Sequence, residues 1–235
     1  MRAFVVSLFV AVSAAAAPVI TSISPTSGTV AGGTVVTIKG SGFVSSATVS
    51  FSTENQIPAA NVTFVDSSTI QATTPPLLPN RYSVSVRQSD GLALALTVFT
   101  VTGDPSEGFE SILFPIFSGP IDGAFGSRFV TDAHAVATTE APVTIDGFNV
   151  GCPGPGTMLT VPGGTDVALS TGCFDFPPAR ILYVAKDQAR NITFNDRVTD
   201  VTRTASSLGT EIPIVRSSRI TNGKIVLPNV PIDSR

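Results

Sequence analysis

The sequence predicts an all-β protein made of two sandwich-like domains. Val, Thr, Ser, Gly and Pro are abundant while only 13% of the residues are charged, a composition that favours strands and turns over helices. Short runs of alternating apolar and polar residues recur, with turn residues about every ten positions. A hydrophobic content of 43% in 235 residues is enough for two cores of ordinary size.

The N-terminus has the pattern of a secretory signal peptide. Arg2 is positively charged, residues 3–12 are apolar, and small residues follow. We expect residues 1–16 to be removed by cleavage after Ala16, with cleavage after Ala17 as the alternative. An uncleaved membrane anchor is disfavoured because the apolar run is shorter than the ~20 residues that span a bilayer. The mature chain is then expected in the periplasm, on the cell surface or outside the cell, without a transmembrane segment.

The first domain begins with short strands separated by turns. Residues 18–43 predict two strands around a Gly-rich loop, and residues 47–51 alternate again. Residues 61–73 predict two more strands, separated by the polar Asp66-Ser67-Ser68. Prolines 75, 76 and 79 then interrupt regular structure.

A hairpin follows and closes this domain. Tyr82, Val84 and Val86 alternate with polar residues, Asp90-Gly91 predicts a type I′ turn, and residues 92–101 predict the returning strand. The domain is expected to end near Thr102.

The residues of this first region resemble the IPT/TIG family over residues 18–102. The resemblance rests on Pro18, Ile20, Ile23, Pro25, Gly28, Gly32-Gly33-Thr34, Val36, Ile38, Gly40, Phe43, Val49, Phe51, Ile70, Ala72, Thr73, Pro75, the strand from Tyr82 to Val86, and Gly91. It implies an early-set immunoglobulin-like β-sandwich over residues 17–102. Members of this family occur in receptors, bacterial surface proteins, polysaccharide-active enzymes and some transcription factors, so the resemblance implies a fold more than a function.

A second β-rich domain is expected over residues 109–235, after a polar linker at residues 103–108. Its predicted strands are residues 112–117, 125–130, 142–145, 158–161, 166–169, 179–187 and 192–194, followed by a hairpin at Asn222-Gly223 between residues 219–221 and 224–227. This region resembles, more weakly, an uncharacterised region that accompanies IPT/TIG modules in secreted bacterial proteins, which implies no activity. Because the chain stops directly after a strand-like stretch, we treat truncation of a longer protein as an open alternative.

The chain has two cysteines, Cys152 and Cys173. An even number in an exported chain predicts one structural disulfide, stabilising by about 3 kcal/mol in the chain-entropy model. A reduced or metal-binding pair is the alternative, but the sequence lacks the further ligands and spacing of a zinc site.

Catalytic chemistry has few candidates here. The only histidine, His134, lies two residues after Asp132, so both side chains would share one face of a strand. No Gly-x-Ser-x-Gly motif accompanies them. Glu107 and Glu110 could in principle form a glycosidase pair, but linker solvation is the simpler interpretation. We therefore predict no catalytic residue and no enzyme activity.

Metal and cofactor sites are equally sparse. Asp104, Glu107 and Glu110 form a local acidic group where calcium binding stays open, although no EF-hand spacing supports it. The glycines of the first domain lack a Gly-x-x-x-x-Gly-Lys pattern and are interpreted as turn glycines rather than a phosphate cradle. The residues predicted to be structural in this sense are Gly28, Gly32, Gly33, Gly40, Gly91 and Gly223, together with the core residue Phe43. No cofactor or metal is expected.

Aromatic residues decide between binding modes. Exposed Trp or Tyr usually forms sugar platforms, whereas this chain has no Trp and two Tyr, Tyr82 and Tyr183, both expected in cores. The apolar segment from Phe109 to Phe117 could leave an exposed patch for a partner, but burial against the neighbouring domain is the favoured alternative.

These observations predict a non-catalytic protein of the cell envelope or exterior, acting in adhesion, protein interaction or domain spacing. Two alternatives remain, an accessory polysaccharide-binding module and a fragment of a longer secreted enzyme. A net charge of −3 and the absence of a Lys/Arg cluster disfavour nucleic-acid binding. The expected partner is an unidentified protein or polysaccharide.

Overall fold

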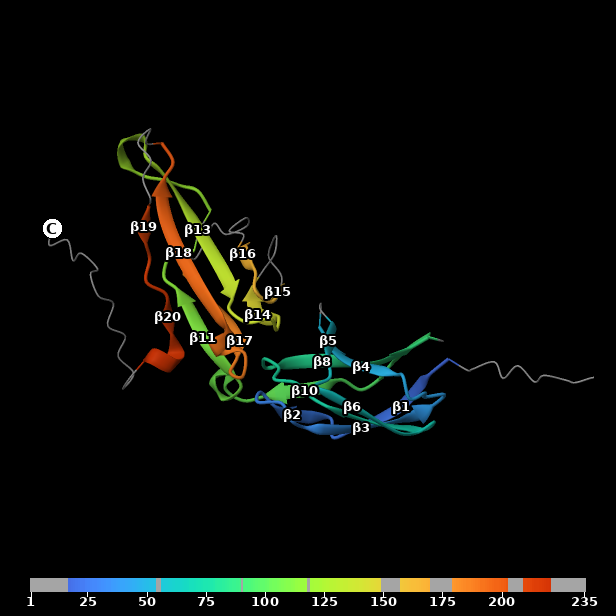
Figure 1. Ribbon diagram of the computed structural model, residues 1–235. Coiled ribbons are helices and arrows are strands. Elements are labelled where there is room, and N and C mark those ends of the chain that lie inside the picture. The colour runs from blue at the N-terminus through green and yellow to red at the C-terminus, as the bar shows by residue number, and fades with distance from the viewer. Residues whose placement is uncertain are drawn as a thin grey trace, which may run out of the picture. The chain divides into compact units, whose positions relative to one another are not determined.

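The computed structural model describes residues 17–53, 56–89, 91–117, 119–148, 157–169, 179–202 and 209–220. The chain divides into two compact units, which contain two β-sandwiches in chain order (Figure 1). Unit 1 comprises Met1–Gly28, Gly33–Pro75 and Arg81–Thr100, and unit 2 comprises Thr29–Gly32, Pro76–Asn80 and Val101–Arg235. The predicted all-β class is confirmed: the described regular structure consists of strands and short 3-10 turns.

Two sheets form the first sandwich. Its strands are β1 (Val19–Ser24), β2 (Ser27–Thr29), β3 (Val35–Ser41), β4 (Thr48–Ser52), β5 (Gln56–Pro58), β6 (Asn61–Asp66), β7 (Thr69–Thr73), β8 (Asn80–Gln88), β9 (Gly91–Leu94) and β10 (Phe99–Thr102). One sheet has the order β1-β3-β7-β6, and the other β2-β10-β8-β4-β5, with β9 also paired to β8.

Alternation along these strands builds the core of the first sandwich. In β8 the side chains of Tyr82, Val84 and Val86 are buried, as their spacing predicts. From neighbouring strands, the rings of Phe51 and Phe99 meet edge to face with centroids 5.4 Å apart. The predicted inward set is therefore the observed core.

The predicted hairpin forms with a different register. Gln88 lies opposite Gly91, so Gly91 opens strand β9 instead of occupying the turn; Asp90 lies outside the described residues. The returning segment is also not one strand. It breaks between β9 and β10, where the side chain of Leu96 is 96% exposed.

The predicted structural glycines are required for two different local reasons. Gly32 and Gly33 have φ of 74° and 76°, a conformation that glycine adopts without strain. Gly28 and Gly40 instead lie inside strands β2 and β3. At Gly40 an added Cβ would come within 1.9 Å of the Val19 carbonyl oxygen, so only glycine allows β1 to approach β3 this closely. The Phe43 side chain is 2% exposed.

The second sandwich also has two sheets. Its strands are β11 (Phe109–Phe114), β12 (Ile121–Asp122), β13 (Arg128–Ala137), β14 (Val143–Phe148), β15 (Thr157–Val161), β16 (Asp166–Leu169), β17 (Arg180–Ala185), β18 (Ile192–Asp200), β19 (Thr210–Glu211) and β20 (Val215–Arg216). One sheet has the order β15-β14-β17-β11-β20, and the other β12-β13-β18-β19, with β16 also paired to β13. The 3-10 turns are η1 (Pro105–Glu107), η2 (Ala124–Gly126), η3 (Ala189–Asn191) and η4 (Ser217–Arg219).

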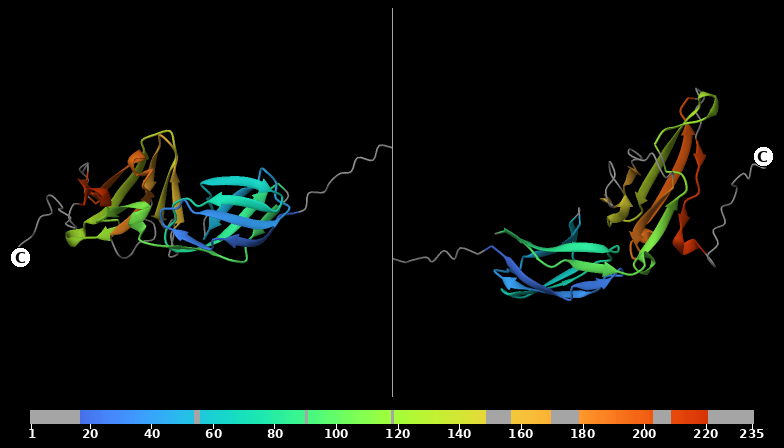
Figure 2. Two further views of the ribbon diagram at one scale, coloured as in Figure 1. Left: turned by 90° about the horizontal axis from the view of Figure 1, so that it is seen from below. Right: turned by 180° about the vertical axis from the view of Figure 1, so that it is seen from behind.

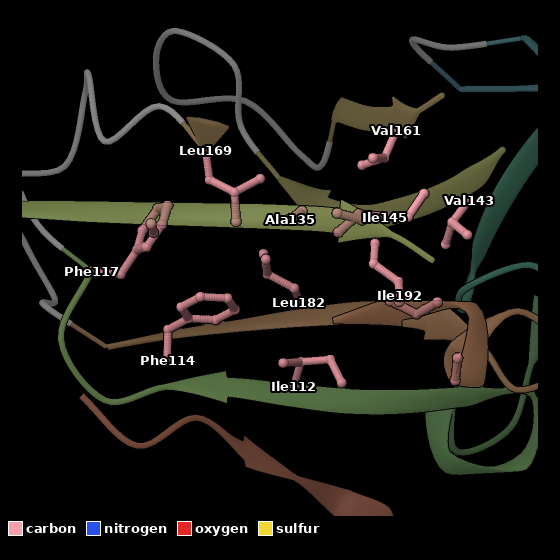
Figure 3. Close-up of a cluster of buried hydrophobic side chains, with 14 residues drawn as sticks. Ile112, Phe114, Phe117, Ala135, Val143, Ile145, Val161, Leu169, Leu182 and Ile192 are labelled. Atoms are coloured by element: carbon pink, nitrogen blue, oxygen red, sulfur yellow. The ribbon is translucent and has the colours of Figure 1, made fainter. Parts of the chain in front are cut away.

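Aliphatic and phenylalanine side chains from both sheets fill the space between them (Figure 3). Phe114 lies at the centre of an aromatic group, with ring centroids 5.4 Å from Phe117 and 5.6 Å from Phe194. The phenylalanines of the segment from Phe109 to Phe117 are all buried, so the predicted exposed patch is wrong. Phe114 and Phe117 belong to the core of their own sandwich.

Other predictions for the second domain also need correction. Phe125 was expected to begin a strand but lies in η2, and β13 begins only at Arg128. Strand β18 extends to Asp200, well beyond the predicted end at Phe194. Tyr183 was expected in the core, yet it is half-buried on the outer face, where its ring packs against Phe109 at 6.4 Å.

Several predictions fall on residues that the structure does not describe. These are the signal peptide at residues 1–16, the cysteines Cys152 and Cys173, and the hairpin at Asn222-Gly223. Arg219, at the start of that hairpin, is described and lies in η4 rather than in a strand. Within the described ranges, no helix is long and apolar enough to cross a membrane.

Candidate functional site

The hairpin that joins β12 to β13 has a compact loop. Asp122 pairs with Arg128 across the two strands, leaving residues 123–127 as the loop. The Gly123 amide donates to the Ser127 carbonyl at 2.8 Å, and the Ser127 hydroxyl donates to the Ala124 carbonyl at 2.7 Å. Because the loop bonds to itself, its conformation is defined without a partner.

Phe125 occupies the end of this loop in a strained and fully exposed state. Its φ and ψ are 58° and 28°, and its side chain has a relative exposure of 108%. The left-handed region costs a non-glycine residue roughly 1–2 kcal/mol, and burial of a phenylalanine ring would stabilise by about 1.5–3 kcal/mol. At this position the backbone conformation is costly and the exposed ring contributes no burial energy. Strained residues of this kind cluster at functional sites.

Other exposed apolar side chains lie on the strands next to this loop. Ile121 and Phe129 lie directly opposite each other across the hairpin and are 48% and 39% exposed. Val201, 55% exposed, is tied to the same end by a 2.9 Å hydrogen bond from its amide to the Arg128 carbonyl. We call Ile121, Phe125, Phe129 and Val201 the aromatic tip. It lies at the end of the long strands β13 and β18 (Figure 1, and Figure 2, right).

Charged groups beside the aromatic tip have partners within the same end of the sandwich. Arg128 Nη1 lies 3.7 Å from Asp122 Oδ1. The carboxylate of Asp200 accepts hydrogen bonds from the Arg128 amide at 3.3 Å and from the Thr202 amide at 3.1 Å. Arg128 thus offsets the charge of Asp122, whereas these bonds to Asp200 come from uncharged backbone amides.

Sequence reasoning missed the aromatic tip. The available signal was the pattern Gly123-Ala124-Phe125-Gly126, in which two glycines flank a bulky aromatic residue in a short segment. The pattern marks a turn that displays its aromatic side chain, whereas the alternation of residues 125–130 suggested a strand.

The candidate catalytic pair is brought together, and a third residue joins it. His134 Nε2 lies 3.0 Å from Asp132 Oδ1, and His134 Nδ1 lies 2.7 Å from Asp166 Oδ1 on β16. The hydrogen bond to Asp166, followed by that to Asp132, raises the pKa of His134 above its ordinary value. Both ring nitrogens are occupied, so neither is available to accept a proton from a substrate. In this arrangement the histidine joins β13 to β16.

The acidic group near the linker separates into different roles. Asp104 caps η1 by accepting a 2.8 Å hydrogen bond from the Ser106 amide, which lowers the pKa of this carboxyl. Glu110 is 6% exposed and points between the sheets. In the described part of the chain, no three His, Cys, Asp or Glu residues are arranged to hold a metal ion.

Glu110 takes part in a buried ion pair. Its carboxylate accepts from Arg216 Nη1 at 2.9 Å and from the Ser218 hydroxyl. Arg216 also donates to the backbone carbonyls of Ala189 and Ile192. Because both Glu110 carboxyl oxygens are bonded to Arg216 and Ser218 and the residue is buried, Glu110 serves the packing of the sandwich.

Residues 18–101 match the family model of the IPT/TIG domain. The predicted resemblance is therefore confirmed for the first sandwich. The match covers less than half of the chain, so it defines the class of this domain and leaves the second sandwich unassigned.

Comparison with solved structures gives partial similarities. A structural genomics protein of unknown function from Bacteroides thetaiotaomicron is 14% identical, with 81% of this chain and 48% of that chain covered and a TM-score of 0.37. An auxiliary nutrient binding protein from the same organism is 16% identical, with 48% and 26% covered and a TM-score of 0.30. SGBP-B, from a complex xyloglucan utilization locus in Bacteroides uniformis, is 12% identical, with 78% and 73% covered and a TM-score of 0.31.

The chain spans about half the length of the first of these structures and about a quarter of the second. No curated protein sequence matches it.

Proposed function

We propose that this chain is an exported, non-catalytic binding protein whose second sandwich presents the aromatic tip to a partner. The observation that carries the proposal is Phe125, which is fully exposed on a strained backbone within a loop that bonds to itself. A ring held in this way is ready for binding and loses little conformational entropy when it is buried by a partner.

A protein with an apolar pocket is the partner that best fits this shape. A single protruding phenylalanine, with the exposed Ile121 and Phe129 on the adjoining strands, resembles the aromatic anchors that dominate protein interfaces. A polysaccharide would be held better by several aromatic rings on one flat face. The adhesion or interaction role therefore has more support than the polysaccharide-binding alternative.

Site-specific photocrosslinking tests this proposal. A photoreactive phenylalanine analogue is placed at position 125 of the full chain in its source cells, and in a control at position 64, where the native phenylalanine is 38% exposed in the first sandwich. We expect a discrete protein adduct from position 125 and none from position 64. Equal crosslinking at the two positions, or none at position 125, would overturn the proposal.

A separate binding experiment tests the polysaccharide alternative. Retention of the purified chain on insoluble cellulose or amylose, abolished by Phe125→Ser and kept by Leu96→Ser, would replace the protein partner with a glycan. Leu96 is a matched control because it is a 96% exposed apolar residue outside the aromatic tip.

A further inference from the structure

Strand β9 of the first sandwich directs its small side chains inward and its large ones outward. Ala93 is 6% exposed, whereas Leu92 and Leu94 are 45% and 60% exposed. The sandwich therefore uses the alanine for its core and leaves much of both leucine side chains in contact with water, which is unfavourable for apolar surface. We call Leu92 and Leu94 the leucine edge.

The backbone groups of the leucine edge point away from their own sheet. Within the described residues, β9 pairs with β8 alone. The Ala95 amide donates to the Val84 carbonyl at 2.8 Å, so the N–H and C=O groups of Ala95 and, by alternation, of Ala93 point toward β8. Leu92 and Leu94 hold the alternate positions, so their N–H and C=O groups point toward the opposite side of β9.

This edge lacks the features that usually prevent strands of different molecules from pairing. Such features are charged residues, prolines and β-bulges. Residues 91–96 contain no charged residue and no proline, and β9 pairs with β8 without a register shift. By contrast, β6, an edge strand of the other sheet, has a bulge between Phe64 and Asp66 and the charge of Asp66 itself. An extended segment can therefore add to the sheet at β9.

A second copy of β9 is complementary to this edge in an antiparallel arrangement. A two-fold axis at Ala93 places Leu92 of each copy opposite Leu94 of the other. These opposite residues both carry outward-pointing N–H and C=O groups, which antiparallel strands exchange in pairs. The same pairing puts leucine beside leucine on one face of the sheet, where apolar cross-strand pairs are stabilising.

The charge nearest to the leucine edge permits this self-pairing. Arg87 is exposed and lies opposite Leu92 on β8. In the paired arrangement, the Arg87 residues of the two copies are separated by three strand spacings, about 14 Å. Because the Debye length at physiological ionic strength is about 8 Å, their repulsion is largely screened.

We infer that the leucine edge joins two copies of this chain into a dimer with one continuous sheet across their β9 strands. The inference concerns the first sandwich and does not depend on the aromatic tip having a partner. One short strand buries less area than a standard interface of roughly 1,600 Å², so the dimer dissociates at low protein concentration.

Sedimentation velocity of the full mature chain at increasing concentration tests the inference. We expect a monomer–dimer equilibrium whose dissociation constant rises at least tenfold in Leu94→Lys, because the two introduced charges approach each other across the two-fold axis. The control Val35→Lys replaces a 51% exposed apolar residue on β3, which lies between β1 and β7, and should leave the dissociation constant unchanged. Matching thermal unfolding curves verify that both variants are folded.

Amide hydrogen exchange measured by NMR locates the interface. The amides of Leu92 and Leu94 should become protected as the protein concentration rises, whereas those of Ala93 and Ala95 should be protected at every concentration because they face β8. A monomer throughout the micromolar range, an equal effect of Val35→Lys, or a dimer without protection of Leu92 and Leu94 would overturn the inference. The variant Phe125→Ser should dimerise normally, so failure of the aromatic tip and failure of the leucine edge are distinguishable.

Discussion

Arg216 shows how much of the second sandwich depends on one side chain. It reaches from β20 to the space between the sheets, pairs with the buried carboxylate of Glu110, and donates to carbonyls of Ala189 and Ile192. Replacing only the arginine would leave a buried charge and two carbonyls without their partner. Such losses are much larger than the net value of the intact pair.

We therefore predict that Arg216→Ala lowers the free energy of unfolding of the second sandwich by about 3–5 kcal/mol. The control Arg190→Ala, at an exposed position in the same domain, should change it by no more than about 0.5 kcal/mol. Differential scanning calorimetry measures both. A shift in Arg216→Ala as small as that in the control would mean that the buried pair contributes little.

Asp196 is expected to have a large effect on how stability depends on pH. It is fully buried, and neither carboxyl oxygen has a hydrogen-bond partner among the described residues. Burial, and then repulsion from Asp132, raises its pKa from 3.8 to about 7. Below about pH 4 the group is protonated in both states. As the pH rises from about 4 to 7 the unfolded state ionises first, so the folded state loses up to about 4 kcal/mol of relative stability.

We predict that Asp196→Asn removes this decline and is more stable than the parent chain at pH 8. Thermal unfolding midpoints between pH 4.5 and 8 provide the measurement, with Asp187→Asn as an exposed control in the same domain. Parallel pH profiles for the parent chain and Asp196→Asn would contradict the assignment of the slope to this carboxyl.

At the scale of elements, β16 illustrates how a peripheral strand is retained. It pairs with β13 over four positions, from Ala133 opposite Leu169 to Val136 opposite Asp166. On the outer face, His134 adds contacts to Asp166 on β16 and to Asp132 on its own strand. The charged form of the imidazole donates to both carboxylates, so protonation strengthens the attachment of β16.

The pKa of His134 is raised in the folded state, so its stabilising contribution is complete below pH 6.5 and declines as the pH rises through the higher folded value. We predict that His134→Gln loses about 0.5–1 kcal/mol at pH 5.5 and almost nothing at pH 8.5. Hydrogen exchange of the β16 amides at the two pH values measures the stability of the pairing between β16 and β13. A loss independent of pH would show that packing, rather than charge, joins the strands.

For the whole molecule, the predicted disulfide is the main covalent constraint. Cys152 and Cys173 lie outside the described residues, so the bond stays a prediction from their number and the signal peptide. We expect the denatured, non-reduced mature chain to resist alkylation, and reduction to destabilise the fold by about 3 kcal/mol. Intact mass spectrometry would reveal the contrary result as two added alkyl groups.

The same measurement reports the mature N-terminus. Cleavage after Ala16 gives a chain that begins at Ala17, and cleavage after Ala17 gives one that begins at Pro18. A secreted chain that still carries Met1 would contradict the signal-peptide prediction.

Local patterning made the strands of the first sandwich predictable. Alternation in β8 identified Tyr82, Val84 and Val86 as core residues, and the polar turn at Asp66 separated β6 from β7. The break between β9 and β10 was not predictable, because residues 92–101 are mostly apolar and contain no Gly or Pro. Which part of such a run pairs with which neighbour depends on the other strands.

The sequence by itself determined the all-β class, the IPT/TIG character of residues 18–101 and most strand positions, because alternation and turn residues are local signals. Only the tertiary structure decided that Phe125 is fully exposed, that Glu110 meets Arg216 inside the sandwich, and that the leucines of β9 are exposed on a strand that pairs with β8 alone among the described strands. These relations join residues far apart in the chain or depend on which side chains the fold leaves exposed. The spacing of residues along the sequence does not show which distant residues meet or which side chains stay exposed.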